Sequence, residues 1–168
     1  MSRDDVPTTF DERTTLMTLL TYARETAISK ADGITDEQAA RAPLTTSPLM
    51  TVGGVLHHLT WVDRDWIDTR LLGGPDEGPW TDVEPDREFV LGAGLPIAEV
   101  VATYREQTAR LDSLIADLDI DTRAAMPLGN AAAPITLRWI LFHLIEETSR
   151  HNGHLDILRE LIDGTVGS

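Results

Sequence analysis

Apolar residues recur with the 3.6-residue period of an α-helix in four long segments of this 168-residue chain. We expect helices at residues 11–30, 47–72, 96–118 and 136–163. No segment shows a convincing strand pattern. The sequence therefore predicts an all-α fold, a four-helix bundle that forms a single domain over residues 1–168.

Local signals predict where several helices begin and end. Thr35 and Gln38 form a capping motif that indicates a short helical turn. The Ser47-Pro48 pair is typical of a helix start, so we expect the second long helix to begin there. Thr136 and Gly164 are the residue types that cap and terminate a helix, and they delimit the last one.

Residues 73–94 separate the second and third long helices. They contain Pro75, Pro79 and Pro85 among many acidic side chains and have no sustained period. We expect a long loop that crosses between the two helices, and loops of this length are often functional. A second loop, which contains Asn130, joins the third and last helices.

Charge and composition exclude several classes of protein. The chain has 28 acidic and 14 basic side chains, a formal net charge of -14, which disfavours nucleic acid or an anionic membrane as a partner. It contains no run of 18 apolar residues and no basic-then-apolar leader, so we expect a cytoplasmic protein. The chain has no cysteine. Any metal must therefore be held by histidines and carboxylates.

The last helix carries two ionisable residues in its apolar face. Glu147 and His151 fall within the same band as the apolar residues that should face the core. A buried carboxylate is costly unless it is paired or binds a metal, and a spacing of four residues places both side chains on one face. The apolar residues of the band are Leu137, Ile140, Leu144, Leu155, Leu158 and Ile162.

A third metal ligand should come from the second helix, which contains His57 and His58. His58 lies at the edge of the apolar stripe, whereas His57 points to the opposite side and is predicted to be solvated. Two histidines and a glutamate form a standard catalytic zinc set with one open position. Zn²⁺ is the expected metal, although Ni²⁺ or Fe²⁺ fits the same ligands. The alternative is a buried Glu147–His151 ion pair without metal.

Two further histidines, His143 and His154, flank the band in the last helix. Each is a candidate for an additional ligand or for a group that supports a ligand, and the alternative is an ordinary core residue. Trp80, in the long loop, is a candidate for the mouth of a site. The sequence identifies no catalytic residue and no residue that binds a cosubstrate.

Two stretches carry a resemblance to a known family. They are VLHHLTWVDRDW at 55–66 and the segment 137–160, which contains the motif HNGH at 151–154. Together they resemble the DinB-like superfamily. The chain is most similar to the actinobacterial branch related to mycothiol-dependent maleylpyruvate isomerases and mycothiol S-transferases. The resemblance extends over nearly the whole chain, and it implies a bundle with a long crossover between helices two and three.

The resemblance places the family's three metal ligands on His58, Glu147 and His151, which are also the residues chosen by helix geometry. Many DinB-like proteins have a histidine at the position of Glu147, whereas a glutamate there is similar to the mycothiol-dependent isomerases. The family implies mycothiol as a thiol cosubstrate. A metal ion would deprotonate such a thiol and give a nucleophile that this cysteine-free chain lacks.

Three functions remain open from the sequence. The first is a mycothiol-dependent S-transferase or isomerase, whose partners are a small-molecule thiol and an electrophile. The second is a metal-dependent hydrolase with Glu146, His143 or His154 as base. The third is a metal-binding, stress-associated protein without enzymatic activity. Thiol-dependent turnover distinguishes the first function from the others. The sequence leaves the oligomeric state open between a monomer and a homodimer.

Overall fold

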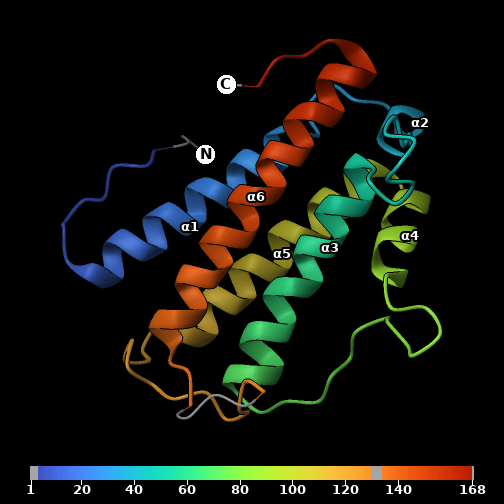
Figure 1. The fold of residues 1–168 in the computed structure, drawn as a ribbon. Helices are drawn as coiled ribbons and strands as arrows, with labels where there is room; N and C mark the ends of the chain where they lie inside the picture. Colours follow the sequence, from blue (N-terminus) through green and yellow to red (C-terminus); the bar gives the residue numbers. More distant parts are fainter. Residues whose placement is uncertain (1–3, 130–133, 168) are drawn as a thin grey trace.

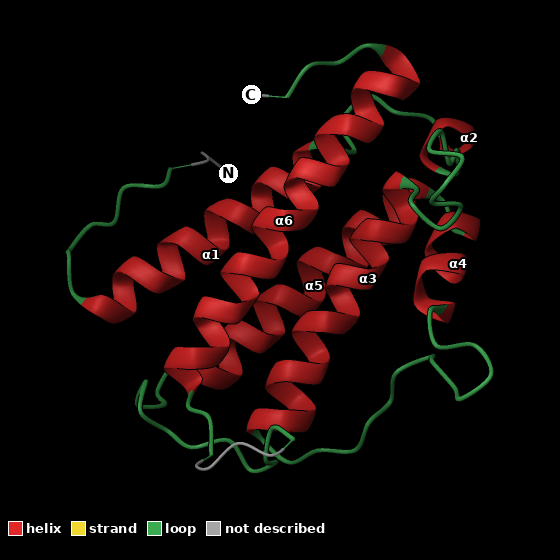
Figure 2. Cartoon of the chain, in the orientation of Figure 1, coloured by secondary structure: helices red, strands yellow, loops and turns green. Residues whose placement is uncertain are grey.

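The computed structural model describes residues 4–129 and 134–167, and helices joined by loops make up its regular structure (Figures 1 and 2). These residues form no strand, and their only β-type pairing is an isolated bridge between Arg123 and Thr136. The all-α prediction is confirmed. Asn130, which we expect in a loop, lies outside the described residues. No helix in the described ranges combines the length and apolar character that crossing a membrane requires.

The helices follow one another in the order shown in Figure 1, and four of them are long. α1 packs against α6, while α3 packs against both α5 and α6. α3 continues directly into a π-helical segment, η1, so that the two together span the bundle. The elements are α1 (Glu12–Ser29), α2 (Asp36–Ala39), α3 (Val52–Arg64), η1 (Asp65–Leu71), α4 (Arg87–Gly94), α5 (Ile97–Ile115) and α6 (Leu137–Asp163).

Three of the four long helices lie where the sequence predicts them. Asp11 caps α1 by accepting a hydrogen bond from the backbone N–H of Thr14. Thr136 caps α6, and Gly164 ends it in the left-handed conformation at φ 79°. The short turn α2 has the expected reciprocal capping box between Thr35 and its third helical residue.

The predicted start of the second long helix is wrong. Ser47 accepts a hydrogen bond from the backbone N–H of Met50 in a separate turn, and the helix begins five residues later. Thr51 is the actual cap, because its hydroxyl accepts from the backbone N–H of Gly54 at 2.9 Å. Ser47-Pro48 therefore forms a turn, which uses the same residue types as a helix start.

The long segment between the second and third helices is only partly a loop. Its last residues form α4, which packs along the N-terminal half of α3. Glycines permit the close approach, because a Cβ at Gly92 would lie 2.4 Å from the His57 Cβ and one at Gly53 would lie 2.6 Å from the Gly92 carbonyl oxygen. The missing side chains thus allow α4 to contact α3 through its backbone.

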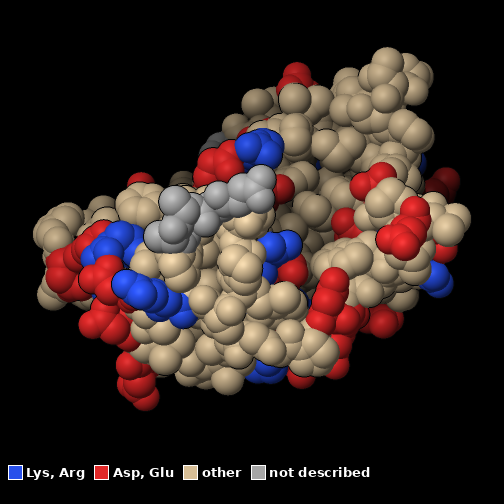
Figure 3. Space-filling model, turned by 60° about the horizontal axis from the view of Figure 1, so that its bottom comes forward, with Lys and Arg blue, Asp and Glu red and all other residues tan. Residues whose placement is uncertain are grey.

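Charged side chains are interspersed with uncharged ones on the face drawn in Figure 3. Many acidic residues are paired with arginines across the surface, including Arg105 with Glu25 and Arg138 with Glu12. Exposed pairs of this kind contribute little to stability. The fold is therefore held mainly by the apolar residues between the helices.

Candidate metal centre

Three side chains from two neighbouring helices converge on one another. His58 comes from α3, and Glu147 and His151 come from successive turns of α6. The Glu147 Oε1 lies 3.2 Å from the His151 Nε2 and 3.8 Å from the His58 Nε2. One ligand atom from each residue lies within 4.8 Å of the other two. The structure therefore brings together the three residues that helix geometry selects.

The three side chains lie at the margin of the core. His151 is buried, with 7% of the residue exposed, while His58 and Glu147 are partly exposed. The two imidazole rings lie 5.0 Å apart and are tilted at 56°, so their planes do not stack on each other. The group is therefore partly open to solvent on the side of His58 and Glu147.

α4 supplies a fourth residue that the sequence analysis missed. Glu88 is buried, and its Oε1 lies 3.1 Å from the Nδ1 of His58, the ring nitrogen that faces away from Glu147. Its Oε2 is buried and has no hydrogen-bond partner among the described residues. Phe89 stacks on the same ring at 4.2 Å. A carboxylate that accepts a hydrogen bond from the outer nitrogen of a histidine is the usual support of a metal ligand.

The prediction that His57 is solvated is wrong. His57 is buried beneath α4, and its Nδ1 lies 2.6 Å from the backbone carbonyl oxygen of Glu88. Its Nε2 accepts a hydrogen bond from the indole N–H of Trp61 at 3.3 Å. The predicted helical phase is correct, since His57 does point away from the α6 side. The solvent expected on that face is replaced by α4.

His154 and His143 have different surroundings. The Nδ1 of His154 lies 3.4 Å from the Nδ1 of His151, so His154 is within hydrogen-bond distance of the ring nitrogen of His151 that faces away from Glu147. His143 instead stacks on Trp139 at 5.1 Å and packs edge-on against Trp66 at 4.5 Å. His143 therefore belongs to an aromatic cluster and has no place in the group formed by His58, Glu147 and His151.

The second oxygen of Glu147 also has a partner. Arg150 donates a hydrogen bond to Oε2 at 3.1 Å, and the same guanidinium pairs with Glu146. Glu146 and Arg150 are exposed. This contact holds the Glu147 carboxylate in place and leaves Oε1 directed at the two histidines.

Burial sets the protonation state of His151. Its pKa is lowered from 6.5 to about 4, first by burial and then by the nearby His58 and His154, while Glu147 acts in the opposite direction. The ring is therefore neutral at neutral pH. A neutral imidazole has the free electron pair that metal coordination requires.

The donor set fits a divalent metal ion. Two imidazole nitrogens and one carboxylate oxygen, with an open side, are the ligands of catalytic zinc sites. The hydrogen bond from His58 to Glu88 fixes the tautomer of that ring so that its Nε2 is free, as a metal ligand needs. The same donors also suit Ni²⁺ or Fe²⁺.

A signal for Glu88 exists in the sequence, but periodicity does not reveal it. α4 has only eight residues, too few for a repeating apolar stripe in a segment with three prolines. The useful signal is the small-residue pattern, Gly53-Gly54 on one helix and Gly92 on the segment that packs against it. Paired glycines of this kind indicate close backbone approach.

Comparison with known proteins adds a family to this geometry. A family model described as Mycothiol-S-transferase matches residues 15–164. The match includes most of α1, all of the later helices, and each of His58, Glu147 and His151. No curated protein matches the chain.

Proposed function

The chain belongs to the mycothiol-S-transferase family, and on this basis we propose that it uses a bound divalent metal ion to join the sulfur of mycothiol to an electrophile. One observation carries the proposal. His58, Glu147 and His151 gather their ligand atoms within 4.8 Å in a chain that has no cysteine. A thiol nucleophile must therefore be supplied by a cosubstrate, and this group of side chains is where it would be activated.

A divalent ion bound here would supply the positive charge that lowers the pKa of a thiol. His58, Glu147 and His151 would hold that ion, and Glu88 holds the outer nitrogen of the His58 ring so that the Nε2 stays available. In the transfer, the thiol proton passes to solvent and the sulfur forms a bond to an electrophilic carbon. The leaving group takes the electron pair of the bond that breaks. A thiol-assisted isomerisation would use the same residues.

Glu147 is compatible with thiol chemistry. A carboxylate ligand would cancel one positive charge, so a metal bound here would lower the pKa of a bound molecule less than one held by three histidines. A thiol is far more acidic than water and still ionises under this weaker influence. We propose Zn²⁺ as the ion, because the ligand set is that of catalytic zinc sites.

The candidate bases of a hydrolase are poorly placed. Glu146 is exposed and pairs with Arg150, while His143 is stacked in the aromatic cluster with Trp139. His154 contacts the outer nitrogen of His151, so its own Nδ1 is already engaged. A general base must reach the attacking molecule within hydrogen-bond distance. These contacts therefore support the S-transferase over the hydrolase.

Metal analysis tests the centre itself. The purified protein should bind a single divalent ion per chain, and His58→Ala, Glu147→Ala and His151→Ala should each lose it. His143→Ala is the matched control and should keep the metal, because that ring is stacked between aromatic side chains. Equal metal content in all five proteins, measured by atomic emission, contradicts the assignment.

Turnover then tests the reaction. The metal-loaded protein should consume a generic electrophile only when mycothiol is present, and removal of the metal by a chelator should abolish that activity. Ester or amide hydrolysis without thiol would favour the hydrolase. A metal-loaded protein that turns over no electrophile with any thiol would instead favour a binding protein without enzymatic activity.

A further inference from the structure

One face of α6 points away from the core and is exposed along most of the helix. Figure 1 shows α6 running between α1 and α3, and both of these helices pack against it. The exposed residues on its outward face recur three or four positions apart, which aligns them in a single stripe. The α6 stripe consists of Trp139, Phe142, Glu146, Arg150, Gly153, Ile157 and Leu161.

Both ends of the α6 stripe are apolar. Trp139 and Phe142 lie at one end and are 40% and 55% exposed. Ile157 and Leu161 lie at the other end and are 49% and 50% exposed. Single exposed apolar residues are ordinary, but large apolar and aromatic side chains that share one face are typical of a surface that packs against another protein.

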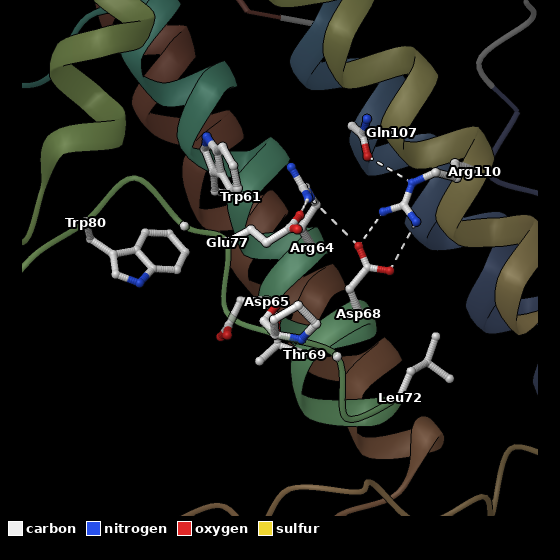
Figure 4. Close-up of a pocket in the computed structure, with 13 residues that line it drawn as sticks. Trp61, Arg64, Asp65, Asp68, Thr69, Leu72, Glu77, Trp80, Gln107 and Arg110 are labelled. Atoms are coloured by element: carbon white, nitrogen blue, oxygen red, sulfur yellow. Dashed lines mark hydrogen bonds and ion pairs between the residues drawn. The ribbon is translucent and has the colours of Figure 1, made fainter.

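The middle of the α6 stripe carries one charge of each sign. Glu146 and Arg150 pair with each other, and all the partners that they have among the described residues, Glu147 included, belong to α6 itself. Other surface ion pairs join different helices, as Arg110 on α5 does with Asp68 on η1 (Figure 4). The two charges of the stripe therefore tie no helices together within one chain, and they are placed to meet charges on a second one.

Gly153 interrupts the α6 stripe with a notch. It lies in the interior of the helix, where glycine is less stable than alanine. A Cβ at this position would meet nothing within 4 Å, and its φ is not positive, so neither packing nor backbone conformation within the described chain requires a glycine. The missing side chain instead leaves room for a side chain of another molecule.

The α6 stripe is complementary to itself when two copies of the helix run antiparallel. Glu146 and Arg150 lie two residues before and after Thr148, and Trp139 and Ile157 lie nine residues before and after it. A two-fold axis at the level of Thr148 therefore places Glu146 opposite Arg150 of a second copy. The same axis places Trp139 opposite Ile157 of that copy.

We propose that the α6 stripe is the interface of a homodimer in which two α6 helices pack antiparallel about a two-fold axis. In this arrangement Phe142 reaches the level of Gly153 of the second copy, and the notch accommodates its ring. A parallel pair would instead set Glu146 against Glu146, and like charges in contact disfavour association. The proposal concerns a surface outside the metal centre and holds whether or not that centre transfers thiols.

Sedimentation of the purified protein tests the association. The parent should sediment as a dimer, and Phe142→Glu should weaken the dimer at least about tenfold, because it places an unpaired charge in the interface. Leu114→Glu is the matched control, since Leu114 is 44% exposed on α5, and it should dimerise as the parent does. A parent that stays monomeric up to about 1 mM, or equal effects of the two variants, would overturn the proposal.

Charge reversal tests the facing positions. Glu146→Arg sets two arginines opposite each other and Arg150→Glu sets two glutamates, so each variant alone should dimerise at least about tenfold more weakly than the parent. A mixture of the two variants restores opposite charges at both facing pairs and should form a mixed dimer, which native mass spectrometry identifies. If the mixture stays monomeric, or if each variant alone dimerises as tightly as the parent, Glu146 does not face Arg150.

Cross-linking determines the orientation. Because the chain has no cysteine, Trp139→Cys and Ile157→Cys each introduce a single thiol. A short maleimide cross-linker should join a mixture of the two variants and leave each variant alone unlinked, since equal positions lie about 27 Å apart along an antiparallel pair. Linkage of Trp139→Cys to itself, or no linkage in the mixture, contradicts the antiparallel dimer. These measurements use neither thiol cosubstrate nor metal, so their failure would leave the proposed S-transferase untouched.

Discussion

His58 contacts two carboxylates through its two ring nitrogens. Nε2 faces Glu147 on α6, and Nδ1 faces the buried Glu88 on α4. A ring with a hydrogen-bonded outer nitrogen has one tautomer and one orientation, so its inner nitrogen is available without reorganisation. Metal affinity should therefore depend on a residue that does not itself join the three candidate ligands.

Substitution of Glu88 tests this dependence. Glu88→Gln keeps the size of the side chain but removes its charge, and metal affinity should fall about 10- to 100-fold. Glu84→Gln is the matched control, because Glu84 is an exposed glutamate of the preceding loop whose ion pair is with Arg87. Competition with a coloured chelator measures both affinities. If Glu88→Gln binds the metal as tightly as Glu84→Gln does, the buried carboxylate does not orient His58.

His151 gives the metal-free protein a pH dependence. Its pKa is about 4 in the folded state, against 6.5 for an unperturbed histidine, so the unfolded chain binds the additional proton as the pH falls between these values. The free energy of unfolding should therefore be highest above pH 6.5 and decrease toward pH 4. His58, Glu147 and His154 face the ring and determine the size of the effect.

Urea unfolding of chelator-treated protein at several pH values measures this decrease. His151→Gln cannot titrate and should lose less stability than the parent over the same interval, while His143→Gln should behave like the parent. An identical decrease in the parent and in His151→Gln would show that other groups cause it.

At the scale of single residues, the sequence predicts the side chains that depend on the phase of one helix. His58, Glu147 and His151 can be identified because each interrupts or borders an apolar stripe. The position of Glu88 and the burial of His57 both depend on α4, which packs against α3, and the apolar period of α3 does not indicate that contact. Residues that support a site from a second helix are therefore the hardest to predict from one sequence.

Some helices can be predicted from the sequence and others cannot. α1, α5 and α6 are long enough for their period and caps to locate them, and each begins within about a residue of its predicted start. α4 is short and follows three prolines, so its sequence resembles a loop. The sequence also does not predict the π-helical form of η1, because a change from an i→i+4 to an i→i+5 hydrogen bond leaves the residue types unchanged.

The glycine contact between α3 and α4 provides a prediction at this scale. Gly92→Ala places a Cβ 2.4 Å from the His57 Cβ, so α4 must move away from α3 and carry Glu88 with it. The protein should lose about 1–3 kcal/mol of stability, the usual cost of overpacking, and bind metal more weakly. Chemical unfolding and the chelator competition measure the two effects.

Gly94→Ala is the matched control on the same helix. A Cβ at Gly94 meets nothing within 4 Å, and its φ is not positive. Alanine there should leave metal affinity unchanged and stabilise the fold slightly, since it reduces the freedom of the unfolded chain. If Gly92→Ala and Gly94→Ala lose metal affinity to the same extent, the close packing of α4 does not position Glu88.

A layer of polar side chains lies between two apolar parts of the core. One apolar cluster includes Ala27 and Leu59, and the other includes Leu20 and Ile67, so both α1 and the continuous helix formed by α3 and η1 run from one cluster into the other. The candidate metal ligands on α6 occupy the same level, between Leu144 of one cluster and Leu155 of the other. The metal centre is therefore part of a wider polar layer between the two apolar clusters.

The buried part of this layer is an ion-pair network that joins three helices. Arg24 on α1 lies 2.9 Å from Asp63 on α3 and 2.8 Å from Asp112 on α5, and both Arg24 and Asp63 are almost fully buried. A buried pair adds little when compared with apolar residues of the same size, but loss of one partner leaves an uncompensated charge. Removal of a single member of the network should therefore lower the free energy of unfolding more than replacement of both members of a pair.

Removal of Asp63 alone should destabilise the whole molecule. Asp63→Ala leaves the Arg24 guanidinium buried without one of its two carboxylate partners, and the expected loss is about 3–5 kcal/mol in the free energy of unfolding. Asp121→Ala, which removes an exposed partner of Arg138, should cost about 1 kcal/mol or less. The double variant Arg24→Met with Asp63→Leu replaces both charges by apolar groups and should recover most of the loss. If Asp63→Ala costs no more than Asp121→Ala, or if the double variant is less stable than Asp63→Ala, the charges are not held as a desolvated pair.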